Sequence, residues 1–263
     1  MRPHRVTIQG VPADCVTRAS ALETVEHMLR GTAAQSIFAV NPEKVMAART
    51  DPRLGAILGR AGLLLPDGIG VVAAARLLGL GRMERVPGCE FMLALCELAA
   101  RRDLGIFLFG GSPESNSQAE HVLLRRYPGL RVAGRQHGYL ADTETPGLIN
   151  RINRSGAELL FVALGSPKQE LWIDAYHPQL RVKVCQGVGG TFDVISGRVR
   201  RAPRAFRTAH LEWFYRLATQ PTRLTRQRAL PRFAVGVLKD LASGLTAKFP
   251  INGRRRKSMP VSN

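Results

Sequence analysis

A chain of 263 residues with 45% hydrophobic amino acids can bury the core of one large domain with an appendage, which excludes a disordered protein. Its formal net charge of +18 lies mostly in residues 198–263, where sixteen Lys and Arg stand against two acids, so the first 197 residues are nearly neutral. This one-sided charge indicates an anionic partner, such as nucleic acid, acidic lipid or a phosphorylated substrate, unless it only keeps the chain soluble.

Short apolar segments alternate with longer amphipathic ones over residues 1–197. The segments that predict strands are Ser36–Val40, Gly62–Leu65, Gly105–Phe109, Leu130–Ala133, Leu159–Leu164 and Val182–Gln186. Those that predict helices are Pro42–Leu58, Gly88–Arg102, Ser115–Tyr127, Pro146–Asn153 and Lys168–Tyr176. This alternation predicts an α/β catalytic domain with a Rossmann-like, mainly parallel sheet and helices on both faces.

The pattern changes near Gly197, and residues 198–263 predict a basic helical appendage without strands. Its helical stretches are Ala205–Thr219, Pro221–Arg228 and Leu230–Leu245. In the last stretch, apolar residues recur at helical spacing beside Arg232 and Lys239, so it can lie in a lipid interface or pack on the domain. We expect the tail, 250–263, to be disordered and to add attraction to anionic lipid.

The four cysteines form no CxxC pair and have no histidine at metal-ligand spacing, which is typical of buried or free thiols in a reducing compartment. The N-terminal sequence lacks the apolar run of a signal peptide, and no segment reaches the roughly 20 apolar residues that cross a bilayer. We therefore expect a cytoplasmic protein that is peripheral on the inner face of the cell membrane.

Polar or glycine-rich turns follow several predicted strands, where ligands bind in open α/β sheets. Asn41 follows the first strand and can cap the next helix. Asp67 stands on a Pro-Asp-Gly turn, either as an ordinary turn former or as a general base on a rigid strand end. Gly110 and Gly111 precede a helix and can offer backbone N–H groups to phosphate.

Two further groups of polar residues come later in the chain. Gln169 and Glu170 fall in the first turn of a predicted helix, where they mark an ordinary helix start or contact a ligand. Arg216, Arg223 and Arg226 share one helical face if the helix continues past Pro221. Such a row matches a diphosphate, and the alternative is a solvated basic face.

Ten short motifs occur in one order between about Ser36 and Arg228. They are Asn41-x-Glu43, Pro66-Asp67-Gly68, Arg85-Val86-x-Gly88, Gly110-Gly111, Gly165-x-Pro167-x-Gln169-Glu170, Gly187-x-Gly189, Phe192-Asp193, Arg201-Ala202-Pro203, Leu211-Glu212-Trp213 and Pro221-x-Arg223. In this order they resemble the WecG/TagA/CpsF glycosyltransferases, glycosyltransferase family 26. The resemblance implies that Asp67 is the catalytic base.

The resemblance also implies the roles of other residues. Asn41, Arg85 and Gln169 would line the sugar-nucleotide pocket, and we expect Gly110, Gly111 and Glu170 to contact substrate as well. The appendage would close over the site with arginines and favour membrane association, and its matching positions are Arg216, Arg223 and Arg226. The chain departs from the family pattern at Ala39, Glu90 and Gln220, where the family often has Thr, Asp and Glu.

The implied reaction is one inverting displacement from a UDP-sugar to a polyprenyl-diphosphate-linked sugar, in the synthesis of a surface polysaccharide or exopolysaccharide. Members of the family transfer N-acetylmannosamine, its uronic acid or glucose. The chain contains no Asp-x-Asp pair, which many nucleotide-sugar transferases use to hold a metal. We therefore expect no metal and no cofactor, with Arg85 and the appendage arginines stabilising the leaving UDP.

Two other classes of protein remain as alternatives. A nucleic-acid-binding protein would interleave basic and exposed aromatic residues or contain a known module, and the chain shows neither pattern. A dinucleotide-dependent oxidoreductase would need a full GxGxxG fingerprint, of which Gly110-Gly111 is only a fragment. We therefore expect no nucleic-acid partner, and the sequence leaves a homo-oligomer open.

Overall fold

The structure, a computed structural model, describes residues 3–199, 203, 206, 215 and 228–244. Its centre is a six-stranded sheet in the order β4-β3-β8-β7-β5-β6, in which every neighbouring pair is parallel. The strands are β3 (Gln35–Val40), β4 (Leu63–Pro66), β5 (Gly105–Gly110), β6 (Arg131–Gln136), β7 (Leu159–Ala163) and β8 (Val184–Gly187). All six predicted strands are present, and the predicted α/β fold is confirmed.

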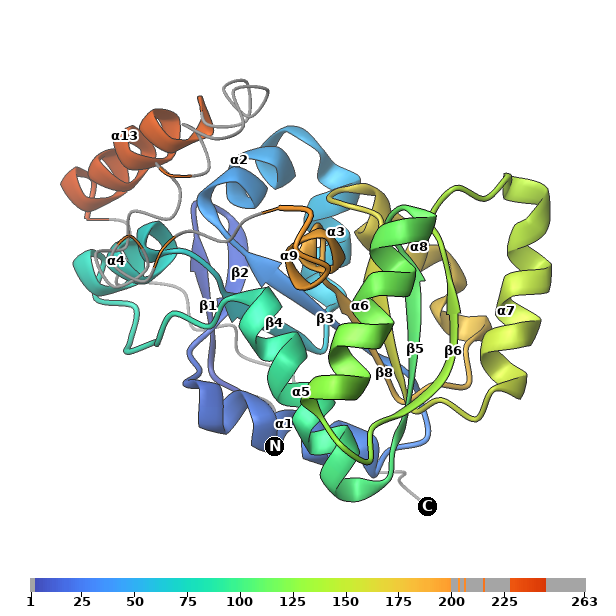
Figure 1. Cartoon of the computed structure of the whole chain (residues 1–263). Helices are drawn as coiled ribbons and strands as arrows, with labels where there is room; N and C mark the ends of the chain where they lie inside the picture. The colour runs from blue at the N-terminus through green and yellow to red at the C-terminus, as the bar shows by residue number, and fades with distance from the viewer. Residues whose placement is uncertain (1–2, 200–202, 204–205, 207–214, 216–227, 245–263) are drawn as a thin grey trace, which may run out of the picture.

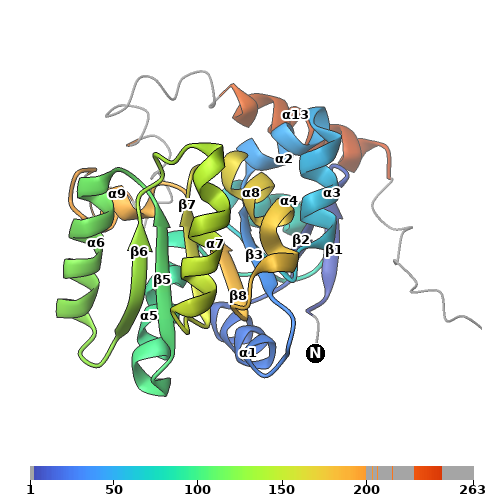
Figure 2. The same ribbon diagram turned by 90° about the vertical axis from the view of Figure 1, so that its right-hand side faces the viewer.

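Helices cover both faces of the sheet (Figures 1 and 2). They are α1 (Arg18–Leu29), α2 (Pro42–Thr50), α3 (Pro52–Arg60), α4 (Ile69–Leu77), α5 (Gly88–Arg102), α6 (Pro113–Arg126), α7 (Thr145–Arg154), α8 (Lys168–Tyr176), α9 (Thr191–Ile195) and α13 (Ala229–Ala242), with short 3-10 turns at Asp142–Glu144 and His177–Gln179. Alternate strand residues face opposite layers. Leu63 and Leu65 pack in the core with α1, α5 and α6, while Leu64 packs in the core with α2, α3, α7 and α8.

The helix predicted over Pro42–Leu58 is wrong as one element, because the chain forms two helices there, α2 and α3. Asp51 ends α2, and its carboxylate caps α3 by accepting from the backbone N–H groups of Arg53 and Leu54. Pro52 at the next position lacks an N–H and fits only the first turn of a helix. The Asp-Pro pair is therefore the physical cause of the break.

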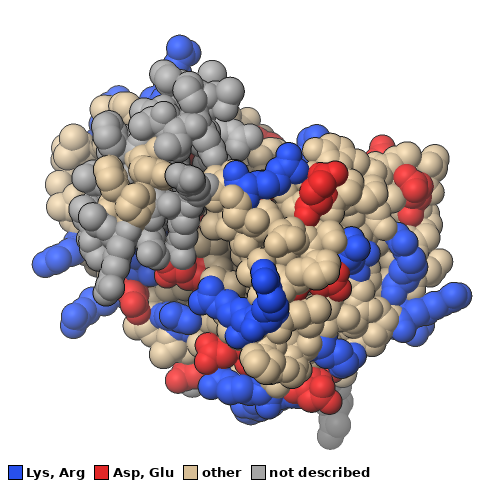
Figure 3. Space-filling view, viewed as in Figure 1, with Lys and Arg blue, Asp and Glu red and all other residues tan. Residues whose placement is uncertain are grey.

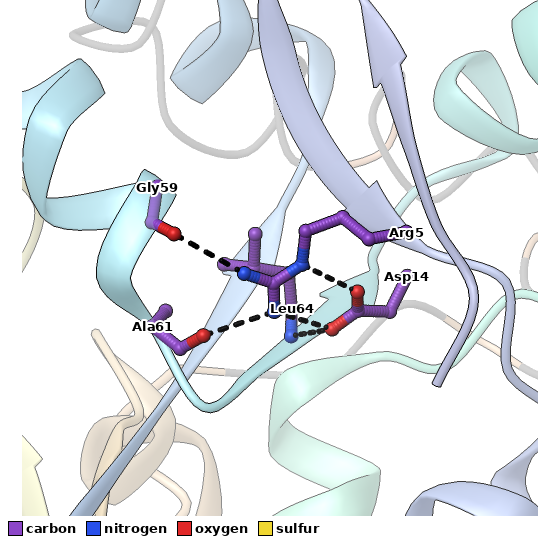
Figure 4. A network of polar contacts seen from close by, with 5 residues as sticks. All are labelled: Arg5, Asp14, Gly59, Ala61 and Leu64. Carbon is purple, nitrogen blue, oxygen red and sulfur yellow. Dashed lines mark hydrogen bonds and ion pairs between the residues drawn. The ribbon is translucent and has the colours of Figure 1, made fainter. Parts of the chain in front are cut away.

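A β-hairpin that the sequence patterns did not predict precedes the sheet. Its strands are β1 (Arg5–Ile8) and β2 (Val11–Asp14), which pair antiparallel beside β4. The buried Asp14 carboxylate accepts from the Leu64 N–H at 2.7 Å and from the Arg5 guanidinium at 2.7 and 2.9 Å (Figure 4). Since β4 is the outermost strand of the sheet, the Leu64 N–H has no neighbouring strand to bond with among the described residues, and the Asp14 carboxylate accepts its hydrogen bond instead.

The predicted helix over Leu230–Leu245 is confirmed as α13. Phe233 and Val237 are each 4% exposed and pack toward α2 and α4, so part of the apolar stripe lies on the domain. Val235, Leu238 and Leu241 are 52%, 60% and 45% exposed, and Val235 borders a groove that α13 forms with Met46 and Arg49 of α2. The helices predicted over Ala205–Thr219 and Pro221–Arg228 lie outside the described residues, apart from isolated positions, as does the tail 250–263. In the described part of the chain, no helix is long and apolar enough to span a membrane.

Candidate active site

The carboxyl ends of the parallel strands lie along one edge of the sheet, the upper edge in Figure 1. Asn41 follows β3, Asp67 follows β4, Gly110 ends β5 and Gln169 begins the helix after β7. The structure thus brings four sequence-predicted site residues to the edge where open α/β sheets bind ligands. Arg216, Arg223 and Arg226 lie outside the described residues.

Asp67 sits between the end of β4 and the beginning of α5. Its backbone N–H donates to the Val40 carbonyl at 2.8 Å, and its Oδ2 lies 3.4 Å from the Gly88 backbone nitrogen, which donates to it. Gly88 is the first residue of the 15-residue helix α5, so the carboxylate faces the positive end of a helix dipole. The side chain is partly exposed and can therefore be reached from solvent.

Arg85 lies in the segment that leads into α5. The next residue, Val86, donates its N–H to the Pro66 carbonyl at 2.8 Å, which places Arg85 next to the Pro66-Asp67 turn. The Arg85 side chain is partly buried. A Cβ added to Gly88 would come within 3.2 Å of Ala39 Cβ, so the glycine permits the close approach of β3, the Asp67 turn and α5.

Asn41 caps α2, as expected from its position, because its Oδ1 accepts from the Lys44 backbone N–H at 2.8 Å. The turn that holds Asp67 packs against this cap. A Cβ added to Gly68, which has a φ of +108°, would lie 3.7 Å from Asn41 Cβ. The turns after β3 and β4 are therefore in contact, and Asn41 and Asp67 belong to one site.

Gln169 and Glu170 occupy the start of α8, and both side chains are buried. Glu170 is 0% exposed and accepts from the Lys44 ammonium at 2.5 Å. Gln169 donates through Nε2 to Glu170 Oε1 at 3.0 Å and accepts through Oε1 from the Gly189 N–H at 2.8 Å. Substrate contact by Glu170 stays a prediction, and the contacts observed for it are with Lys44 and Gln169.

Gly110 and Gly111 form the turn between β5 and α6, and both have positive φ. A Cβ on Gly110 would lie 2.4 Å from the Ala163 carbonyl oxygen, so only glycine fits so close to β7. The Gly111 N–H donates to the same oxygen at 2.9 Å, and it is therefore already committed within the protein. Phosphate contact at this turn stays a prediction.

This turn marks the topological switch point of the sheet. From β5 the chain continues to β6 on one side, and from β7 it continues to β8 on the other, so the direction of the strand order reverses between β5 and β7. The loop after β6 contacts this turn, because Gly138 donates to the Gly111 carbonyl at 2.8 Å. It also carries Tyr139, whose side chain is 74% exposed.

Comparison with known proteins decides the class of the chain. It matches the glycosyl transferase WecG/TagA/CpsF family over residues 6–246. The chain belongs to this family. It is also 37% identical over 203 residues to the N-acetylglucosaminyldiphosphoundecaprenol N-acetyl-beta-D-mannosaminyltransferase of Bacillus spizizenii, across 77% of this chain and 78% of that protein. The predicted resemblance is confirmed, and the chain is an enzyme of the hexosyltransferase class.

The sequence patterns did not single out two residues that lie near the candidate site of this WecG/TagA/CpsF family member. Tyr139 was overlooked because the predicted strand ended at Ala133, whereas β6 continues to Gln136, so the turn after it did not stand at a strand end. Lys44 looked like an ordinary helix residue, and it meets Glu170 only through a contact across 126 residues of sequence. A strand predicted to continue to Gln136 would have marked the turn with Tyr139. No local pattern in the sequence marks the contact of Lys44 with Glu170.

The thiols and acids of this family member do not form a metal centre in the described part of the chain. His, Cys, Asp and Glu side chains form no group of three or more there that could hold a metal ion. All four cysteines are free thiols, and burial raises the pKa of Cys185 to about 12 and that of Cys96 further. These two buried thiols are therefore protonated and unreactive at neutral pH.

Proposed function

We propose that the enzyme transfers N-acetylmannosamine from a UDP-sugar to N-acetylglucosamine linked to polyprenyl diphosphate, in the synthesis of a cell-envelope polysaccharide. The observation that carries this proposal is the placement of Asp67 on a strand-end turn at the carboxyl edge of the sheet. The activity for which the Bacillus spizizenii relative is named supports the sugar and the acceptor. Glucose and the uronic acid of N-acetylmannosamine remain the alternative donor sugars.

The proposed reaction is a single inverting displacement. Asp67 accepts the proton of the acceptor hydroxyl while that oxygen forms a bond with the anomeric carbon of the donor. The bond from the anomeric carbon to the UDP oxygen breaks with its electron pair on UDP, and the configuration at this carbon is inverted. Arg85, beside the Asp67 turn, and Arg216, Arg223 and Arg226 of the appendage stabilise the charge on the leaving diphosphate.

The switch point between β5 and β7 is the proposed binding site of the nucleotide. Ligands of open α/β sheets bind at the topological switch point, and the Gly110-Gly111 turn lies there at the start of α6. Tyr139 follows Gly138, which contacts this turn, and its exposed ring offers a face on which a base can stack. From this site the sugar would extend along the strand ends toward Asn41 and Asp67.

A lipid-linked acceptor requires the enzyme to work at a membrane surface, and we propose a peripheral position on the inner face of the cell membrane. The exposed side of α13 presents Val235, Leu238 and Leu241 together with Arg232 and Lys239. Over the described part of the face drawn in Figure 3, by contrast, basic and acidic side chains are interspersed. An apolar stripe flanked by cations is typical of a helix that lies in an anionic interface.

A donor screen tests the function. The purified enzyme is mixed with a short-chain polyprenyl-diphosphate N-acetylglucosamine and, in separate reactions, with UDP-N-acetylmannosamine, its uronic acid or UDP-glucose. We expect the first donor to be preferred and the product linkage, read by NMR, to have the configuration opposite to that of the donor. Retention of configuration would contradict the displacement, and turnover with UDP-glucose alone would contradict the assigned sugar.

A further inference from the structure

A buried ion pair joins the first turns of two helices at the site. Lys44, in the first turn of α2, is 7% exposed, and Glu170, in the first turn of α8, is 0% exposed. Their charged atoms lie 2.5 Å apart, and the Lys44 ammonium also stands 5.8 Å from the centre of the Phe38 ring. Removing two charges from water is costly, and such a pair stabilises a fold no better than apolar side chains of the same size. Its presence therefore calls for a role other than stability.

The second partner of Glu170 is the amide of Gln169, which is itself 3% exposed. An ionised carboxylate can only accept a hydrogen bond, and the Gly189 backbone N–H can only donate one. Between them, Gln169 must direct Nε2 toward Glu170 and Oε1 toward Gly189, as observed at 3.0 and 2.8 Å. The two contacts thus decide which end of the amide faces which way.

Both contacts are needed to hold this amide. The last torsion of a glutamine side chain is broad, so one hydrogen bond alone leaves the amide plane free to rotate. The slot around it is narrow, because a Cβ added to Gly187 would lie 2.8 Å from Gln169 Nε2 and 3.2 Å from Phe38. Position therefore comes from the glycine slot, while orientation comes from Glu170 and Gly189.

We propose that Lys44 and Glu170 are a positioning pair that orients the Gln169 amide, and so links the turns after β3, β7 and β8 into one donor-sugar pocket. The Lys44 ammonium donates to Glu170 Oε1, the same oxygen that accepts from Gln169, and the Lys44 backbone N–H donates to the Asn41 cap. In this role both members act on the donor pocket through the Gln169 amide. The inference rests on the proposed function only in assigning Gln169 to the donor pocket.

The test replaces the pair without removing the fold. The double variant Lys44→Met with Glu170→Met removes both charges together. It also removes Glu170 Oε2, which is buried without a hydrogen-bond partner among the described residues. We expect thermal stability close to that of the parent, because apolar replacement of a buried pair is often neutral or better. We also expect the KM for the UDP-sugar to rise about tenfold with a smaller change in kcat, from the loss of one charge-assisted hydrogen bond on the amide.

A charge-reversed variant, Lys44→Glu with Glu170→Lys, sharpens the test. It keeps an ion pair but places a donor where Gln169 Nε2 needs an acceptor, so the amide faces donors on both sides. We expect its KM to exceed that of the double methionine variant. The matched control is Asp174→Asn, on the same helix as Glu170. This change breaks the exposed ion pair of Asp174 with Arg60 of α3 and should leave KM unchanged.

Amide hydrogen exchange at Gly189, followed by NMR, reads the network without relying on activity. Faster exchange in both double variants, together with a raised KM, supports the proposal. Parent-like exchange and KM in the stable double methionine variant would overturn it, as would faster exchange with an unchanged KM. If the parent enzyme turned over no UDP-sugar, the proposed function would fail, while parent-like exchange in the variants would still refute the positioning of Gln169.

Discussion

At the scale of single residues, the proposed base Asp67 gives the most direct test. Asp67→Asn removes the proton acceptor but keeps the shape of the turn, so we expect turnover to fall about 10²- to 10⁴-fold while UDP binding stays nearly unchanged. Steady-state kinetics and calorimetric titration with UDP measure the two effects. Asp103→Asn is the control, since Asp103 is a left-handed helix cap with a 91% exposed side chain. A variant that kept more than about half of the parent rate would disprove the assignment of the base.

Gly110 tests the close approach of β5 and β7 at the switch point. Gly110→Ala would force a Cβ to within 2.4 Å of the Ala163 carbonyl oxygen at a φ of +113°. We expect a loss of about 2–4 kcal/mol in the free energy of unfolding, from strain and overpacking together. Denaturant titration measures it, with Gly147→Ala in α7 as the control.

The control has the opposite expected sign. No atom lies within 4 Å of a Cβ added to Gly147, which is in a helix and exposed. Alanine there should stabilise the protein by about 0.5–1 kcal/mol through its better helix propensity. Equal losses at both positions would show that the steric argument at Gly110 is wrong.

At the scale of elements, the hairpin protects the end strand of the sheet through one carboxylate. Asp14→Ala leaves the Arg5 guanidinium and the Leu64 N–H without their acceptor. We expect the free energy of unfolding to fall by about 3–5 kcal/mol, because one member of a buried pair is lost. Thermal denaturation gives the measurement. At a temperature where the variant stays folded, its kcat should remain close to that of the parent, since Asp67 lies beyond the other end of β4.

Helix α13 has a buried face and an exposed face, for which we propose separate roles. Phe233 and Val237 are buried on the domain, whereas Leu238 and Leu241 are exposed. A helix removed as a whole would therefore uncover part of the core, so point variants separate the roles better than truncation. We predict that Leu238→Glu with Leu241→Glu weakens co-sedimentation with anionic vesicles but preserves the rate on a soluble acceptor analogue.

The buried face supplies the contrasting variant. Phe233→Ala should lower the free energy of unfolding by about 3–5 kcal/mol through the cavity that it leaves. Vesicle binding measured below its unfolding temperature should stay close to that of the parent. If the glutamate variant bound vesicles as the parent does, the exposed face of α13 would not be a membrane contact.

At the scale of the whole molecule, we predict that arginine side chains, and not a metal ion, compensate the negative charge of the leaving UDP. The sequence contains no Asp-x-Asp pair, and the described residues form no cluster that could hold a metal ion. The appendage holds most of the net charge, and the diphosphate needs a counter-charge. We expect turnover to survive EDTA at a concentration above that of any carried-over metal. Activity that disappeared in EDTA and returned with magnesium or manganese would contradict this expectation.

The amino-acid sequence by itself determined the fold class, most helix and strand positions, and the turn that holds Asp67. These features depend on local patterns. Helices α5 and α8 begin and end at the predicted residues, because their apolar spacing and the residues at their ends are local signals. The motifs at the strand ends could also be found in the sequence, because each directly follows a predicted strand. A parallel sheet brings all of these carboxyl ends to one side, so the motifs were expected to lie together.

Only the tertiary structure decided what the polar residues at this edge contact. Lys44 and Glu170 are 126 positions apart, and their pairing depends on β3 and β7 lying on either side of β8. Gly111 has an N–H that the sequence offers to phosphate, yet the adjacent β7 accepts its hydrogen bond. The hairpin beside β4 and the buried face of α13 likewise depend on contacts between segments that are distant in sequence. Burial and hydrogen-bond partners are set by segments distant in sequence, and no local pattern contains them.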